Sequence, residues 1–284
     1  MLASATARGH RVVPRLAGQV HTGMFVNTRG LGRAPNDMCP LGARRIEVAG
    51  VRRVDAVYQW GEDDPRVLAL HGWGADSTTM AAVVDVAVAQ GDSVVCFDAP
   101  GHGASRGSQA TITEYAEAIG AVLQRFTGIE VVVAHSLAAI AAVAAIARSG
   151  PGRVQSLLLL APACSLSGVL DRWAAQRRLP TGVAVLIAEE LHRRDGVPVS
   201  HWDIRTLGLG PDVRVRIVHD PHDPSVPVSD AWEIAAGGRA ELVQTAGVGH
   251  DGILGSEPMR AALTSLLLAN DHQQPPPGKA VQSR

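Results

Sequence analysis

The segment EVVVAHSLAAI, residues 130–140, contains a serine between a strand signal and a helix signal. Three consecutive valines indicate a buried strand, and the alanine-rich run after Ser136 indicates a helix. Ser136 would then lie at the C-terminal end of the strand, and the first N–H groups of the helix would point toward it. The segment therefore predicts a serine hydroxyl presented at one edge of a sheet.

The residues on either side of Ser136 are small, as a sharp turn requires. A strand-to-helix turn that presents a serine nucleophile usually has the pattern G-x-S-x-G, because neighbouring backbone crowds this strained turn. Ala134 and Ala138 stand at the two glycine positions. Taken alone, A-x-S-x-A leaves two interpretations open: a nucleophile, or a small residue that ends a core strand.

The composition of the chain excludes several classes of function. Its 284 residues suit one α/β domain, and the hydrophobic share of 46% with only 4% aromatic residues predicts an aliphatic core. With 26 basic and 27 acidic residues, the chain has no strong field to bind nucleic acid or an anionic membrane. Three cysteines without a C-x-x-C pair argue against a disulfide framework and a zinc knuckle. We find neither a transmembrane run nor a signal-type leader, and expect a cytoplasmic location.

Predicted strands and helices alternate along most of the chain. Strands that are apolar throughout and alternate with helices indicate a parallel sheet covered on both faces. The first two strands are separated by Ala49-Gly50 and should form an antiparallel edge. The predicted strands are 44–48, 51–60, 67–70, 93–97, 130–133, 154–160, 213–218 and 240–245, and the predicted helices are 77–90, 113–126, 137–148, 229–236 and 257–268. We therefore expect an α/β fold with a mostly parallel, twisted, eight-stranded sheet.

Three segments lie outside this alternation. Residues 1–42 lack clear periodicity, and we expect a partly ordered N-terminal arm. The main domain is expected to span 43–269, with an insertion at about 165–208, after the sixth strand, that contains two helical stretches. Residues 270–284 are polar and proline-rich, and we expect disorder there.

Chemically useful side chains follow several of the predicted parallel strands. In an open parallel sheet, ligands bind at the C-terminal ends of the strands. HGWG at 71–74 follows the third strand, Ser136 the fifth, HDPHDPSVP at 219–227 the seventh, and AGVGH at 246–250 the eighth. These segments should meet at one edge of the sheet.

Over residues 44–269 the chain resembles the α/β-hydrolase superfamily, and within it the small bacterial esterases that have a short helical cap after strand six. The resemblance rests on five motifs in the expected order: HGWGA at 71–75, DAPGHG at 98–103, AHSLA at 134–138, HDPHDPSVP at 219–227 and GVGH at 247–250. It implies the α/β-hydrolase fold, with helices on both faces of the sheet and a helical cap over its active edge.

The resemblance also implies a role for five residues. Ser136 would be the nucleophile and His250 the base that removes its proton. Asp223 would orient His250 and stabilise its imidazolium form. The backbone N–H groups of Trp73 and Leu137 would form the oxyanion hole.

Two alternatives concern the residues after the seventh strand. Asp220 is a second candidate for the acid and is otherwise a turn residue. His219 and His222 lie close together, but the spacing places no third ligand beside them. We therefore expect no metal and no cofactor.

The expected function is hydrolysis of a small to medium carboxylic ester through an acyl-enzyme. The expected partner is a small-molecule acyl substrate, without nucleic acid or membrane, and the oligomeric state stays open. The same triad could serve a thioesterase, a carbon–carbon bond hydrolase or a cofactor-free perhydrolase. A non-catalytic binding protein on a hydrolase scaffold is a further alternative, motivated by the alanines beside Ser136. In the insertion, Trp173 and Trp202 could line an acyl pocket or pack inside the cap. The arginines of the insertion could face solvent or attract an anionic substrate such as a CoA thioester.

Overall fold

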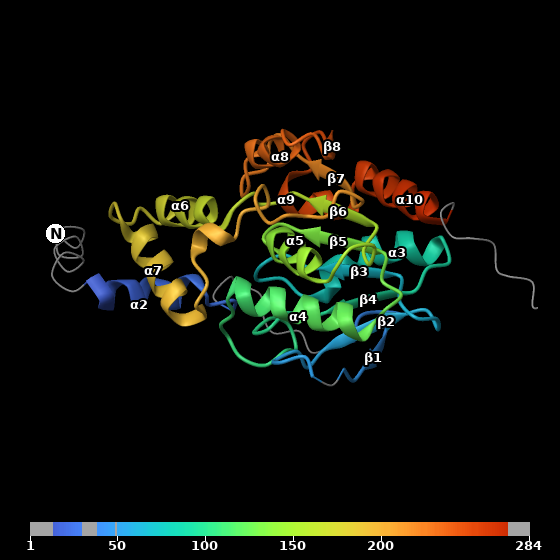
Figure 1. Ribbon diagram of the computed structural model, residues 1–284, viewed down its shortest axis with the longest axis horizontal. Coiled ribbons are helices and arrows are strands. Elements are labelled where there is room, and N and C mark those ends of the chain that lie inside the picture. Colours follow the sequence, from blue (N-terminus) through green and yellow to red (C-terminus); the bar gives the residue numbers. More distant parts are fainter. Residues whose placement is uncertain (1–13, 30–38, 49, 272–284) are drawn as a thin grey trace, which may run out of the picture.

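A computed structural model describes residues 14–29, 39–48 and 50–271 and contains one eight-stranded sheet (Figure 1). The strands are β1 (Arg44–Ile46), β2 (Val57–Trp60), β3 (Val67–Leu70), β4 (Val94–Phe97), β5 (Val131–His135), β6 (Ser156–Leu160), β7 (Arg214–His219) and β8 (Ala240–Gln244). Their order is β1-β2-β4-β3-β5-β6-β7-β8. β2 pairs antiparallel with β1 and β4, whereas all other pairs are parallel. The predicted α/β-hydrolase fold is confirmed.

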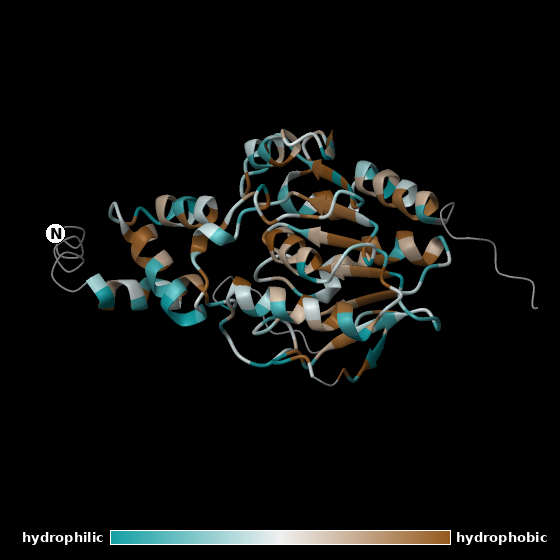
Figure 2. Cartoon of the chain, viewed as in Figure 1, coloured by the Kyte–Doolittle hydropathy of each residue, from teal (hydrophilic) through white to brown (hydrophobic). Residues whose placement is uncertain are grey.

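Helices cover both faces of this sheet. The helices are α2 (Pro14–Phe25), α3 (Ala81–Ala89), α4 (Ile112–Arg125), α5 (Ala138–Arg148), α6 (Leu166–Gln176), α7 (Val183–Asp195), α8 (Val228–Ala235), α9 (Gly249–Gly252) and α10 (Glu257–Asp271), with the short 3₁₀ turns η1 (Ser77–Met80), η2 (Val199–His201) and η3 (Ile253–Gly255). Alternate strand residues belong to two cores: Leu68 and Leu70 pack with α4 and α5, whereas Val67 and Ala69 pack with α3 and α10. This alternation follows from the two-residue period of a strand. Figure 2 shows hydrophobic residues concentrated in these central strands.

The second strand is shorter than predicted. β2 begins at Val57, whereas the sequence pattern suggested a strand from residue 51. Arg53 has a φ of 60°, which no strand allows. Its guanidinium pairs with Glu114 on α4, so this stretch forms a turn fixed to the neighbouring helix.

An unexpected helix, α2, lies inside the segment that we predicted to be a partly ordered arm. It packs against α7, and with α6 and α7 it forms a lobe beside the sheet (Figure 1). A Cβ atom on Gly18 would lie 2.9 Å from the backbone oxygen of Leu186 in α7, so the close approach of the helices depends on this glycine. Residues 1–13 and 30–38 of the predicted arm and 272–284 of the predicted tail lie outside the described residues.

The chain after α2 is tied to the main domain. The N–H of Thr28 donates to the oxygen of Ser108 at 3.0 Å, and the N–H of Ala110 donates to the oxygen of Val26 at 3.0 Å. Through these bonds the N-terminal segment and the loop before α4 hold each other in place. Among the described residues, we find no helix with the length and apolar character needed to cross a membrane.

Candidate active site

Ser136 lies at the turn between β5 and α5, as the sequence predicted. Its φ of 58° is in the left-handed region, which non-glycine residues rarely adopt. The turn is held in part by a hydrogen bond of 2.9 Å from the N–H of Ser136 to the oxygen of Leu160 in β6. Ala134 and Ala138 are both fully buried, so the two methyl groups that replace glycine hydrogens are accommodated inside the core. Strain of this kind is often found where a side chain must be presented for chemistry.

The side chains of Ser136, His250 and Asp223 form one hydrogen-bonded row. Nε2 of His250 lies 3.0 Å from Oγ of Ser136, and Nδ1 of His250 lies 2.6 Å from Oδ2 of Asp223. Three parts of the fold supply them: the turn after β5, the short helix α9 after β8, and the loop after β7. The distance of 3.0 Å is ordinary for a hydrogen bond, and the distance of 2.6 Å is short, as charge-assisted hydrogen bonds are.

The carboxylate of Asp223 is fixed by backbone donors. Its Oδ1 accepts the N–H of Ser225 at 2.7 Å and that of Val226 at 2.9 Å. Burial raises the pKa of Asp223, but the hydrogen bonds from His250 and the backbone together lower it by more, so the pKa is below its usual value. Asp223 is therefore an ionised acceptor that faces Nδ1 of His250.

Asp220, the alternative acid, has a different position. Its Oδ2 accepts the N–H of Val248 and, at 2.9 Å, that of Gly249, while its Oδ1 accepts the N–H of His222 at 2.8 Å. Burial raises the pKa of Asp220, but these three backbone donors lower it to about 2. Asp220 thus anchors the loop that begins α9 and positions His250, a role that the sequence analysis did not identify.

The loop after β3 passes directly beside the turn at Ser136. A Cβ atom on Gly72 would lie 2.7 Å from Nδ1 of His135 and 3.4 Å from Cβ of Ser136, so only glycine permits this approach. Among the described residues, the backbone N–H groups of Trp73 and Leu137 have no protein acceptor. Two free donors beside a serine hydroxyl are the feature expected of an oxyanion hole.

A buried histidine stabilises this loop. Nδ1 of His71 donates to the oxygen of Gly72 at 2.8 Å, and its Nε2 accepts the N–H of Ala99 at 3.0 Å. The Tyr115 hydroxyl donates to the oxygen of His71 at 2.8 Å. These bonds give His71 a structural role in holding the loop after β3. The neighbouring His102 is buried, and burial together with His71 lowers its pKa to about 3.

His135, the residue before the serine, contacts His250 through a hydrogen bond and through its ring. Its Nε2 donates to the backbone oxygen of His250 at 3.0 Å, and the centroids of the two rings are 4.7 Å apart. Burial and the nearby His250 lower the pKa of His135 to about 4, so its ring is neutral near pH 7. Because the His135 ring is neutral, it adds no positive charge beside the imidazole of His250.

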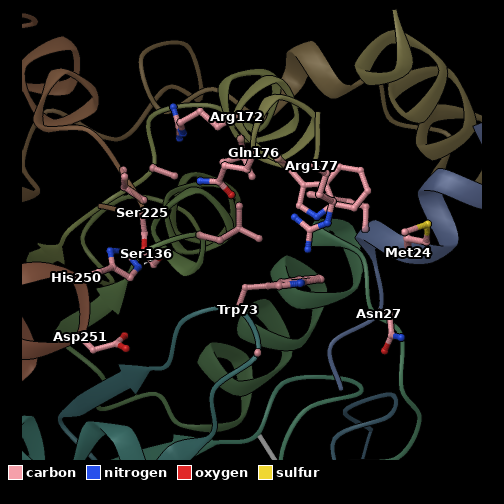
Figure 3. A pocket seen from close by; sticks show the side chains of 17 residues that line it. Met24, Asn27, Trp73, Ser136, Arg172, Gln176, Arg177, Ser225, His250 and Asp251 are labelled. Atoms are coloured by element: carbon pink, nitrogen blue, oxygen red, sulfur yellow. Dashed lines mark hydrogen bonds between the residues drawn. The ribbon is translucent and has the colours of Figure 1, made fainter. Parts of the chain in front are cut away.

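A cavity of about 560 Å³ opens beside Ser136 and His250 (Figure 3). The cap contributes Val169 and Trp173 to its lining, whereas Trp202 is only 2% exposed and belongs to the core. The helix α2 and the residues after it contribute Met24, Phe25 and Asn27, which no motif of the sequence indicated. Such a volume accommodates a small organic molecule.

One group of side chains has the spacing of a metal site. Ligand atoms of His135, His250 and Asp251 lie within 4.8 Å of one another. However, the two ring nitrogens of His250 already contact Ser136 and Asp223. A metal at this position would have to displace one of them, so the arrangement fits a proton-transfer site and does not fit a metal centre.

One family model and several solved structures match this chain. The family model described as serine aminopeptidase, S33, matches residues 61–247. No curated protein matches the chain significantly. An esterase from Pyrococcus furiosus has a TM-score of 0.61 at 17% identity, with 84% of this chain and 95% of that one covered. Est1E from Butyrivibrio proteoclasticus, solved with ferulic acid bound, has a TM-score of 0.59 at 18% identity, with 81% and 100% covered. The alpha/beta hydrolase domain-containing protein 10 from mouse has a TM-score of 0.57 at 18% identity, with 81% and 98% covered. At these identities the solved structures show the fold.

Proposed function

The chain belongs to the α/β-hydrolase superfamily, in the serine aminopeptidase S33 family of hydrolases, and we therefore propose that it is a serine esterase with Ser136, His250 and Asp223 as its triad. The single observation that carries the proposal is the position of the His250 ring, which joins the Ser136 hydroxyl to the Asp223 carboxylate. A binding protein has no need for this row, whereas acyl transfer requires it.

The proposed reaction begins at the serine hydroxyl. Oγ of Ser136 attacks the ester carbonyl while its proton passes to Nε2 of His250, and Asp223 stabilises the imidazolium through Nδ1. The carbonyl oxygen becomes an oxyanion that the N–H groups of Trp73 and Leu137 stabilise. The C–O bond to the alcohol then breaks, and the alcohol leaves with the proton from Nε2. Water repeats the sequence on the acyl-enzyme and releases the carboxylic acid and free Ser136.

The cavity supports a small to medium carboxylic ester as substrate. Trp73, Leu137, Val169 and Trp173 give it apolar walls beside the serine. An apolar enclosure limits water at the reacting carbonyl and strengthens the electrostatic contacts there. The volume of about 560 Å³ suits an acyl chain of moderate length together with its alcohol.

A fluorophosphonate probe tests the proposal directly. We expect one mass adduct on Ser136, its loss in Ser136→Ala, and a strong reduction in His250→Ala. Hydrolysis of p-nitrophenyl acetate and butyrate should follow the same order. If folded protein gave no adduct and hydrolysed neither ester, the chain would be better described as a binding protein on a hydrolase scaffold.

A substrate panel separates the chemistries that share this triad. Esters, thioesters, lactones and an aminoacyl anilide should be compared by kcat/KM under the same conditions. Preference for esters supports the proposal, whereas preference for thioesters or for the anilide would reassign the chemistry without changing the role of the triad.

A further inference from the structure

The cavity contains a row of aromatic rings in contact with one another that ends at a cation. The rings of Trp73 and Phe25 are 6.5 Å apart with an interplanar angle of 18°, and Phe25 meets Trp173 edge to face at 5.6 Å. Cζ of Arg177 then lies 4.4 Å from the ring centroid of Trp173. The row joins three elements, the loop after β3, helix α2 and the C-terminal end of helix α6, so the fold places Arg177 at the end of an aromatic wall.

Two arginines line the cavity, but they differ in their partners. Arg172 donates to both carboxylate oxygens of Asp230, at 3.1 and 3.0 Å, so its charge is compensated. Arg177 has no carboxylate partner among the residues that the structure describes. Its guanidinium is held by a ring face alone, and such stacking leaves the N–H groups at its edge free to donate.

The free cation lies across the cavity from the catalytic row. Figure 3 shows Arg177 on the side of Met24, with its guanidinium directed into the cavity above Trp73, whereas Ser136, His250 and Asp251 lie at the opposite side. The acidic side chain of the cavity is therefore separated from Arg177. A substrate that reaches from Ser136 along the aromatic wall would end at an uncompensated positive charge.

We propose that Arg177 forms a subsite for an anionic oxyacid group, a carboxylate or a phosphate, on the part of the substrate remote from the reacting carbonyl. This inference rests on the proposed esterase function of the same site. A guanidinium fork matches two oxygens of such a group, and charge-assisted pairs of this kind are stronger than neutral ones. Arg177 is exposed to solvent at the edge of the cavity, so dissolved salt should screen the pair.

Matched substrates test the subsite. Monoethyl esters of succinate, glutarate, adipate and suberate carry a carboxylate at the far end of the acyl chain. Their neutral partners keep the ethyl ester and have a primary amide of nearly the same shape in place of the carboxylate. Acyl-CoA thioesters instead carry phosphates on the leaving group. We expect wild-type kcat/KM to be about fivefold higher for at least one anionic probe than for its neutral partner, the upper end of what one exposed ion pair contributes.

Substitutions assign this preference to one side chain. Arg177→Gln should reduce the ratio of anionic to neutral kcat/KM to about one, mainly through KM, and Arg177→Lys should keep part of it. Arg178→Gln is the matched control, because Arg178 is the next residue and does not line the cavity. The wild-type ratio should also shrink as sodium chloride is added, which a purely structural role would not produce.

A binding measurement separates this inference from the esterase proposal. Calorimetric titration of Ser136→Ala with the same esters and CoA thioesters needs no catalysis, and adding Arg177→Gln should weaken binding of the anionic probe about fivefold. Dependence on Arg177 with the monoesters places the anion on the acyl chain, and dependence with the CoA thioesters places it on the leaving group. Binding that depends on Arg177 without any hydrolysis would retain the subsite and reject the esterase. Hydrolysis without dependence on Arg177 for every probe would retain the esterase and overturn the subsite.

Discussion

Replacing Asp223 with asparagine should invert the proton arrangement of the triad. Oδ1 of Asp223 accepts two backbone N–H groups, at 2.7 and 2.9 Å, and Oδ2 faces Nδ1 of His250 at 2.6 Å. In Asp223→Asn, the amide oxygen must stay with the two backbone donors, because an NH₂ group there would oppose two N–H groups. The NH₂ group is then directed at Nδ1 of His250.

This orientation places the imidazole in its unproductive tautomer. Nδ1 must accept from the amide, so the proton of the neutral ring moves to Nε2, which can no longer take the proton of Ser136. Loss of the correct tautomer is expected to lower kcat by about 10⁴-fold. That factor corresponds to about 5 kcal/mol in the activation free energy.

The assay is kcat/KM for p-nitrophenyl butyrate between pH 6 and 10, in wild type, Asp223→Asn and the surface control Asp85→Asn on α3. The melting temperature of Asp223→Asn should change little, because the backbone hydrogen bonds to the side-chain oxygen persist. If Asp223→Asn kept more than about a tenth of wild-type activity while remaining folded, the argument from the fixed amide orientation would be wrong.

Three further outcomes follow from buried groups. Ala134→Val adds two methyl groups to a fully buried position, so activity should be lost and the free energy of unfolding should fall by about 1–3 kcal/mol. Ala138→Gly should keep activity. Wild-type rates in Ala134→Val would disprove the crowding argument. Burial lowers the pKa of His102 to about 3 and that of His135 to about 4, so both stay neutral in the fold while the unfolded chain takes up protons. The free energy of unfolding should therefore fall between about pH 6.5 and pH 4, by up to about 3 kcal/mol per pH unit. Denaturant titrations at pH 7 and pH 5 measure this fall, and His135→Gln should reduce its slope. Gly18→Val places a methyl-bearing carbon 2.9 Å from a backbone oxygen of α7, which should separate α2 from α7. Limited proteolysis should then cut the chain before residue 29 sooner than in wild type. Unchanged cleavage would mean that the contact between α2 and α7 is not needed to order α2.

Much of the fold could be predicted because its signals are local. Each central strand is a short apolar run, and the predicted bounds of the helices α3, α4, α5 and α8 agree with the structure within a few residues. The sequence also placed Ser136, Asp223 and His250 at neighbouring strand ends, and the structure brings these side chains into one hydrogen-bonded row. Their catalytic roles stay predictions, which the fluorophosphonate experiment addresses.

Helix α2 could not be predicted because its buried face carries no hydrophobic pattern. It buries Gly18, Thr22 and Phe25, whereas its periodic apolar residues Leu16 and Val20 are 55% and 54% exposed. A search for an amphipathic helix finds the wrong face. The role of Asp220 was hidden for another reason: it depends on backbone N–H groups from the loop after β8, which are distant in sequence and carry no residue signature.

The wall that α2 adds to the cavity has a consequence for the order in which the molecule matures during synthesis. α2 is translated before every strand, but its packing partner α7 follows six of the eight strands. A helix of 12 residues is marginal in water without tertiary contacts. A nascent chain that stops before residue 183 therefore lacks both the packing partner of α2 and His250. The cavity and the proposed triad are complete only after His250 has been translated, so we expect the proposed activity to appear late in synthesis.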